Sequence, residues 1–140
     1  MPFRSLLLLL AVAALAAGCQ TTQPRDPEPT GAALRADVMV DGTSILGAWH
    51  AVEVVGNATA TRDLAEGVME QTLIVRSNGR ATLTGVDHRA GGDPVAFSGR
   101  VTGNRIQFAE MEGAGTLIMS GRRLLLRDPN GRSTVFVRGE

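Results

Sequence analysis

Short apolar runs separated by tight-turn signals occupy the chain from residue 45 onward, and this spacing restricts it to an antiparallel β fold. Asn78 and Gly79 lie between two runs of β-forming residues, which is the strongest short-range signal of a β-hairpin. Gly103 and Gly121 stand at the first central position of two further turns, as type II′ turns require. These and similar turns delimit eight predicted strands, at residues 45–55, 71–77, 80–86, 95–101, 105–109, 115–120, 123–128 and 132–138.

Apolar and polar side chains alternate along these runs, as they do when one face of a strand is buried. Val95 and Phe97 share one face of their run, whereas Ser98 and Arg100 share the other. A meander of eight such strands has two exposed edges unless it closes, and closure into a barrel removes both. We therefore predict an all-β fold, a small eight-stranded up-and-down antiparallel barrel that resembles the lipocalin barrel. The alternative is an open, strongly bent sheet with a helix on one face.

The predicted barrel is small enough to be filled by its own side chains, which would leave no cavity. The side chains expected to face inward are Leu73, Val75, Leu83, Phe97, Ile106, Phe108, Leu117, Leu124, Leu126 and Val135.

Three segments at the start of the barrel carry further expectations. Residues 61–70 contain Asp63 followed by Glu66, the spacing of a capping box, so a short helix or folded loop is predicted between the first two barrel strands. Residues 38–40 fit either a short strand or a flap on the barrel mouth. Glu53 shares the strand face of Trp49 if alternation is regular, and it is then a buried carboxylate that needs a partner such as an Arg. Alternatively, a β-bulge at residues 54–55 turns Glu53 to solvent.

The N-terminal segment has the layout of an export signal. Arg4 supplies a positive charge, and residues 5–17 form an uncharged Leu/Ala-rich run, shorter than the ~20 residues that span a bilayer. Small residues then precede Cys19, and this arrangement resembles the lipobox of bacterial lipoproteins. The resemblance implies cleavage before Cys19 and acylation of Cys19, with palmitate among the acyl groups. Gln20 in place of Asp implies sorting to the outer membrane, with the protein facing the periplasm.

Residues 20–30, QTTQPRDPEPT, carry three of the six prolines and no large apolar residue. Such a segment cannot bury enough apolar surface to fold, and its prolines keep it extended. We therefore divide the chain into a signal peptide at 1–18, a lipidated cysteine with a Pro-rich tether at 19–43, and a β-barrel domain at 44–140.

Gly47 and Trp49 open the first predicted barrel strand in a Gly-x-Trp arrangement. This triplet, ahead of an eight-strand pattern, is similar to the signature of lipocalins and their calycin relatives. The resemblance implies that Gly47, Trp49 and Arg138 close one end of the barrel, with Arg138 packed on the Trp49 ring by a cation–π contact. It also implies a small apolar ligand. The same features resemble small periplasmic inhibitors of secreted metalloproteases, which implies a protein partner instead.

Composition excludes some classes of function. The chain has 14 basic residues, all of them Arg, and 14 acidic residues, so it lacks the basic surplus that nucleic-acid binding needs. Cys19 is the only cysteine, and no intrachain disulfide can form. We expect a membrane-bound protein, attached through its lipid anchor, with no nucleic-acid partner.

No catalytic residue, cofactor or metal is expected. His50 and His88 are the only histidines, and no serine lies in a Gly-x-Ser-x-Gly elbow. Asp87, His88 and Asp93 could hold a metal ion, or they could form a polar, glycine-rich turn. The predicted function is a non-catalytic binding or structural role of a lipoprotein in the cell envelope, not an enzyme. The alternative is a protein-binding module, such as a periplasmic protease inhibitor or an envelope-complex subunit.

Overall fold

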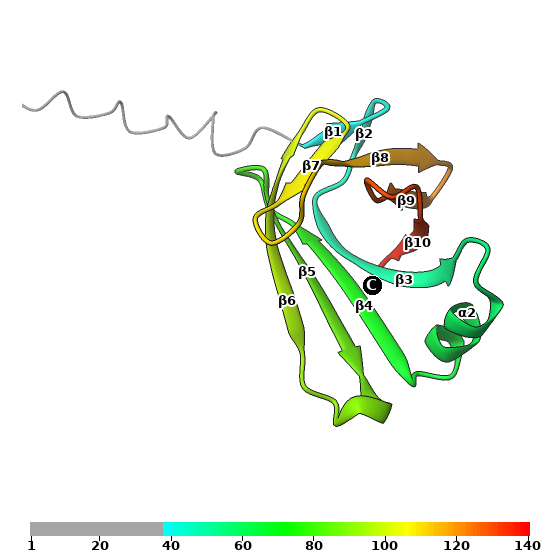
Figure 1. Cartoon of the computed structure of the whole chain (residues 1–140). Coiled ribbons are helices and arrows are strands. Elements are labelled where there is room, and N and C mark those ends of the chain that lie inside the picture. The colour runs from blue at the N-terminus through cyan, green and yellow to red at the C-terminus, as the bar shows by residue number, and fades with distance from the viewer. Residues whose placement is uncertain (1–37) are drawn as a thin grey trace, which may run out of the picture. The chain divides into compact units, whose positions relative to one another are not determined.

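The computed structural model describes residues 38–140 of the protein (Figure 1). Cys19, the predicted signal peptide and the predicted tether up to residue 37 therefore lie outside the described residues. The elements are β1 (Met39–Val40), β2 (Thr43–Ser44), β3 (Gly47–Val54), α2 (Ala58–Ala65), β4 (Met69–Val75), β5 (Arg80–Asp87), the 3₁₀ turn η3 (His88–Ala90), β6 (Val95–Thr102), β7 (Arg105–Phe108), β8 (Gly115–Ser120), β9 (Arg123–Arg127) and β10 (Ser133–Arg138).

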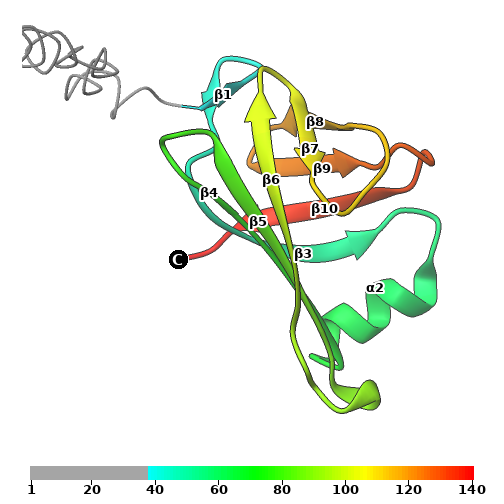
Figure 2. The same cartoon turned by 60° about the vertical axis from the view of Figure 1, so that its left-hand side comes forward.

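Strands β3 to β10 form one closed antiparallel barrel in which each strand pairs with its neighbours in sequence and β10 pairs with β3. The prediction of an eight-stranded up-and-down barrel is confirmed, and each barrel strand overlaps one of the predicted ranges. Tight turns alternate with longer connections. The turns between β4 and β5, β6 and β7, and β8 and β9 all lie at the end where β3 begins, which we name the closed end. The longer loops lie at the opposite end, which we name the mouth (Figure 2).

The apolar core is concentrated toward the closed end. Its largest fully buried side chains are Trp49, Phe136, Ile45, Leu73, Ile106, Leu117, Leu124 and Val40. Leu83 and Phe97, nearer the mouth, are only partly buried against this core. Most of the predicted inward side chains are therefore in the core, but Phe136 was not among them.

Val135 was predicted to face inward, and this prediction is wrong. Phe136 lies opposite Leu124 on β9 and is fully buried in the core, and Thr134 lines an internal cavity. Because side chains alternate along a strand, Val135 between them faces outward. Val135 is itself buried, but it is not part of the core cluster.

A β-bulge decides the position of Glu53. Ala51 pairs with Phe136 and Glu53 pairs with Val135, so β3 has one extra residue, Val52, where β10 has none. The bulge places Glu53 on the outer face of the barrel, where its carboxylate is 4.0 Å from the guanidinium of Arg123. Of the two expectations, the solvent-facing one is correct, although the bulge lies at Val52 and not at residues 54–55.

The β1–β2 hairpin covers the closed end. Val40 and Ile45, on either side of β2, are buried in the core. The Asp41 carboxylate accepts a hydrogen bond of 3.0 Å from the backbone N–H of Met119 on β8, which fixes the hairpin to the barrel. Residues 38–40 thus contribute a short strand, and it covers the closed end rather than the mouth.

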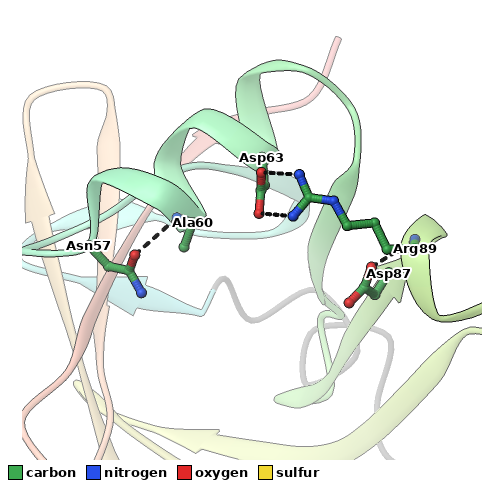
Figure 3. Close-up of polar contacts among 5 residues, drawn as sticks. All are labelled: Asn57, Ala60, Asp63, Asp87 and Arg89. Carbon is green, nitrogen blue, oxygen red and sulfur yellow. Dashed lines mark hydrogen bonds and ion pairs between the residues drawn. The ribbon is translucent and has the colours of Figure 1, made fainter.

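The helix begins and ends earlier than predicted. Helix α2 spans Ala58–Ala65, and its N-cap is Asn57, whose side-chain oxygen accepts a hydrogen bond of 3.0 Å from the N–H of Ala60 (Figure 3). The predicted capping box is therefore wrong, because Asp63 lies inside the helix and Glu66 is its C-cap. The position of the helix, between the first two barrel strands, is as predicted. Among residues 38–140, no helix has the length and apolar character needed to span a membrane.

Candidate functional site: the barrel mouth

The barrel wall is incomplete at the mouth. Strand β3 pairs with β4 only over Gly47–His50, and β6 pairs with β7 only from Gly99 onward. Strand β7 pairs with β8 only at Arg105 and Ile106. The remaining parts of β4, β5 and β6 pair only with one another, so they form a three-stranded arm that extends beyond the rest of the wall (Figure 2). The mouth therefore has a gap on each side of this arm.

Helix α2 fills the gap between β3 and β4. The Thr61 hydroxyl oxygen accepts a hydrogen bond of 3.0 Å from the N–H of Val54, and the hydroxyl donates one of 3.2 Å to the Val54 carbonyl. One side chain thus satisfies both backbone groups of the last β3 residue, where β4 has separated from the strand.

An ion pair ties the tip of the arm to this helix (Figure 3). The Arg89 guanidinium donates two hydrogen bonds of 2.8 Å to the Asp63 carboxylate, which is the bidentate geometry that arginine favours. The Asp63 side chain is 14% exposed and that of Arg89 is 62% exposed. Asp87 orients Arg89 by accepting a 2.9 Å hydrogen bond from its backbone N–H. The β4 side of the arm is therefore held in place.

The gap beside β6 remains open. The Glu110 carboxylate accepts a hydrogen bond from the Ser98 N–H, 3.1 Å to its nearer oxygen, and the Ser98 carbonyl accepts one of 2.9 Å from the N–H of Ala109. Closer to the tip, Ala96 has no barrel neighbour on this side. Val95 beside it is 55% exposed, the most exposed large hydrophobic residue among residues 38–140. The mouth thus offers a short bare strand edge next to an apolar surface.

A cavity of about 210 Å³ opens at the mouth. Apolar side chains from five barrel strands make most of its wall, and four polar side chains complete it. The lining residues are Gln71, Leu83, Phe97, Phe108, Met111, Gly113, Gly115, Leu126, Asp128, Pro129, Arg132, Thr134 and Phe136. An apolar cavity of about 150 Å³ can bind a benzene molecule, so this one can accommodate a single ring-sized apolar group. The expectation that side chains fill the barrel holds for the closed end and fails at the mouth.

The cavity continues onto the inner face of the arm. A second hollow there shares Gln71 and Phe97 with the cavity and adds Met69, Gly85 and Val95 to the surface. An apolar group seated in the cavity could therefore extend along the arm toward Val95.

The candidate metal ligands do not converge. Asp87 caps η3, and His88 lies 3.3 Å from the Glu70 carboxylate across the β4–β5 pair. No group of three His, Cys, Asp or Glu side chains among residues 38–140 is placed to hold a metal ion. His50, the other histidine, lies 3.1 Å from the Thr72 hydroxyl on the outer face of the barrel.

The three residues predicted to close the barrel lie together. The Arg138 guanidinium carbon is 4.7 Å from the centre of the Trp49 ring. The guanidinium also donates hydrogen bonds to the carbonyls of Ser44 (2.7 Å) and Leu46 (3.0 Å). Gly47 has φ +110°, a conformation that favours glycine, and a Cβ there would lie 4.0 Å from the Arg138 side chain.

The mouth was not predicted as a site, although four of the side chains that line it were expected to face inward. Leu83, Phe97, Phe108 and Leu126 were all expected to face inward. What the periodicity could not reveal is that three strand pairs separate before they reach the mouth. Gly113 and Gly115 also line the cavity, but a Cβ at either position would lie only 3.0–3.1 Å from neighbouring atoms, so these glycines reflect close packing and were no signal of an opening.

Comparisons with known proteins add little to this description of the mouth. No protein-family model and no curated protein matches the chain. Among solved structures, the chain is similar to a proposed lipoprotein from Streptococcus pneumoniae. The two are 14% identical, the alignment covers 74% of this chain and 98% of the other, and the TM-score is 0.49. Likeness at this level implies nothing about what either protein binds.

Proposed function

We propose that this protein is a bacterial lipoprotein, anchored through Cys19, whose barrel has a non-catalytic binding role and holds one bulky apolar group of its partner in the mouth. The lipobox-like segment supports the anchor, and Gln20 supports the outer membrane, facing the periplasm, as its location. The single observation that supports the binding role is the mouth cavity. Its lining is mostly apolar and includes four polar side chains, and ligand sites in proteins have this composition.

Cys19→Ala is expected to abolish incorporation of radiolabelled palmitate and to release the protein from the membrane fraction. The reason is that the thiol is the attachment point of the acyl chains, and buried methylenes supply ~0.8 kcal/mol each toward membrane binding. Ser5→Ala, within the same N-terminal segment, is the matched control and should label normally. Label that persists in Cys19→Ala would rule out this anchor.

Toluene, a neutral ring-sized probe, is expected to bind in the mouth. Met111 lines the cavity, whereas Met119 lies near the closed end. In a protein with ¹³C-labelled methionine methyl groups, toluene should shift the Met111 signal and leave the Met119 signal unchanged. Thr134→Leu should weaken this binding by about tenfold or more, because Thr134 lines the cavity and a larger apolar side chain fills it.

Thr116→Leu is the matched control for that experiment. It is the same substitution in a barrel strand, but Thr116 does not line the cavity and it pairs with Arg105 and Arg127. Toluene binding should be unchanged in this variant. Equal shifts at Met111 and Met119, or equal weakening in both variants, would contradict a binding site at the mouth.

A protein partner is the second candidate, and the bare edge at Ala96 favours it. An extended peptide could add to β6 as a further strand while one of its side chains enters the cavity, which is a common mode of peptide recognition. A photocrosslinker in place of Val95 separates the two candidates in cells. A discrete protein adduct favours the protein partner, and its absence favours a small apolar ligand.

A further inference from the structure

Charge is divided unequally between the two ends of the barrel. Residues 38–140 carry eleven Arg side chains and eleven carboxylate side chains, so the described chain is neutral overall. Seven of the arginines lie at the closed end: Arg76, Arg80, Arg100, Arg105, Arg122, Arg123 and Arg138. Nine of the carboxylates lie at the mouth end: Glu53, Asp63, Glu66, Glu70, Asp87, Asp93, Glu110, Glu112 and Asp128. Although the described chain is neutral overall, one end of the barrel is basic and the other end is acidic.

The basic end is exposed and largely free of carboxylate partners. All seven arginines are exposed. Of the ion pairs within residues 38–140, one involves an arginine of this end, and it is the 4.0 Å contact between Arg123 and Glu53. The two carboxylates at this end are Asp41, which bonds the Met119 N–H, and Glu140. Seven exposed arginine side chains thus surround one end of the barrel, and of these Arg138 also packs on Trp49 and bonds the Ser44 and Leu46 carbonyls.

The arrangement of these arginines works against the stability of the sheet. Arg80 lies directly opposite Arg100 in the β5–β6 pair. Arg76 lies in the turn that follows β4, and its N–H donates a hydrogen bond of 2.9 Å to the Arg80 carbonyl. Like charges directly opposite each other destabilise a strand pair. The three arginines line one shallow surface hollow of about 610 Å³, where the Arg76 guanidinium donates a hydrogen bond of 3.2 Å to the Thr82 hydroxyl. A repulsive row of this kind indicates an anionic partner that offsets the repulsion.

The covalent path to Cys19 indicates which partner this is. The described chain begins at Val38, whose carbonyl accepts a hydrogen bond from the Ile45 N–H beneath the β1–β2 hairpin. The chain that leads to Cys19 therefore joins the barrel at the basic end. Met39, in the same hairpin, is 44% exposed and adds an apolar group to this surface.

We propose that the closed end docks on the anionic headgroups of the membrane that holds the lipid anchor, so that the mouth faces away from that membrane. This inference rests on the proposed anchor at Cys19. The tether keeps the basic end at a high effective concentration near the bilayer, so each arginine needs to contribute only modestly.

Separation of the two ends prevents the acidic mouth from cancelling this attraction. Strands of seven or eight residues such as β4 and β5 are about 25 Å long at ~3.3 Å per residue. The Debye length at physiological ionic strength is about 8 Å. A membrane in contact with the closed end is therefore attracted by the arginines, whereas most of the mouth carboxylates lie farther from it than the Debye length, so salt screens their repulsion.

Sedimentation with lipid vesicles tests the proposal on the chain from residue 20 onward, which lacks the anchor and contains the entire closed barrel with its core. Binding to vesicles of equal phosphatidylcholine and phosphatidylglycerol should exceed binding to phosphatidylcholine alone by about tenfold or more at low salt. The variant Arg76→Gln, Arg80→Gln and Arg100→Gln should lose most of this excess. The matched control, Arg62→Gln, Arg127→Gln and Arg132→Gln, removes the same charge at the mouth end and should keep it.

The orientation is tested on the same vesicles with a nitroxide-labelled lipid. The Met39 methyl signal should broaden and the Met111 signal should not. Equal binding to both kinds of vesicle, equal loss in the two triple variants, or broadening of Met111 instead of Met39 would overturn the proposal. Release by inorganic phosphate but not by chloride at the same ionic strength would also overturn it, because the arginines would then form a site for a single phosphate group. If palmitate labelling of Cys19 is normal while any of these outcomes is observed, the docking proposal fails and the proposed anchor stands.

Discussion

Trp49→Ala is expected to lower the free energy of unfolding by ~3–5 kcal/mol, the loss typical of removing a large aromatic side chain from a core. Trp49 is 1% exposed and lies between Leu73 on β4 and Arg138 on β10, so its indole joins the first strand of the barrel to the last. Urea denaturation followed by circular dichroism measures the difference. Intrinsic fluorescence cannot be used, because Trp49 is the only tryptophan.

Trp49→Ala would also remove the polar contacts of the indole, in addition to its buried apolar surface. Its N–H donates a buried hydrogen bond of 2.8 Å to the Ile45 carbonyl, which would be left without this partner. Arg138 would lose the ring that it covers while it still bonds the carbonyls of Ser44 and Leu46. The segment that leads from the β1–β2 hairpin into β3 should therefore exchange its amide hydrogens faster.

Trp49→Phe separates these contributions. Phenylalanine keeps an apolar ring for Arg138 and loses the N–H, so we expect a smaller loss of roughly 1–3 kcal/mol. A loss below about 1 kcal/mol in Trp49→Ala would mean that the closed end can repack around the missing ring. In that case the barrel would not be organised around Trp49.

The strands could be predicted because glycine and asparagine residues identify the turns between them. Asn78 and Gly79, Gly103, and Gly121 each meet a backbone requirement that few other residues meet, and all four glycine or asparagine positions lie in the tight turns of the structure. A barrel of hairpins has mostly local strand pairs, so the turns also determine which strands are neighbours. Closure of the barrel could be predicted because an open sheet would leave two strand edges exposed.

Features that depend on contacts between distant segments could not be predicted. The capping-box spacing of Asp63 and Glu66 indicated a helix start, but Asp63 instead pairs with Arg89, 26 residues away. Asn57 caps the helix from a position that the apolar pattern did not mark. The bulge at Val52 likewise depends on the register between the first and last strands, and single-strand alternation does not contain this information.

The same limit explains why the candidate site could be predicted only in part. Alternation identified Leu83, Phe97 and other inward side chains, because facing inward is a property of a single strand. Whether those side chains meet at the centre or leave a cavity depends on how far neighbouring strands stay paired. Pairing stops early between β3 and β4, between β6 and β7, and between β7 and β8, and the opening follows from these three separations.

Phe136→Ala is expected to lower the free energy of unfolding by ~3–5 kcal/mol as well. Phe136 has no exposed surface, belongs to the core cluster and forms part of the cavity wall at the mouth. Its removal therefore creates an apolar space that joins the existing cavity of about 210 Å³. Urea denaturation with and without toluene measures both the loss and the response to a ligand.

Val135→Ala is the matched control, because it tests the neighbouring side chain, which faces the outer side of the barrel. It should cost about 1–2 kcal/mol, less than Phe136→Ala, and toluene should not alter that cost. In Phe136→Ala, toluene should restore part of the lost stability, since a ligand that binds only the folded state stabilises it in proportion to the logarithm of its concentration over its Kd. Equal losses in the two variants, without rescue by toluene, would mean that Val135 faces the interior and that the register of β10 differs by one residue. Rescue confined to Phe136→Ala would show that Phe136 forms part of the wall of the mouth cavity. It would also connect the stability of the barrel directly to its capacity to bind an apolar group.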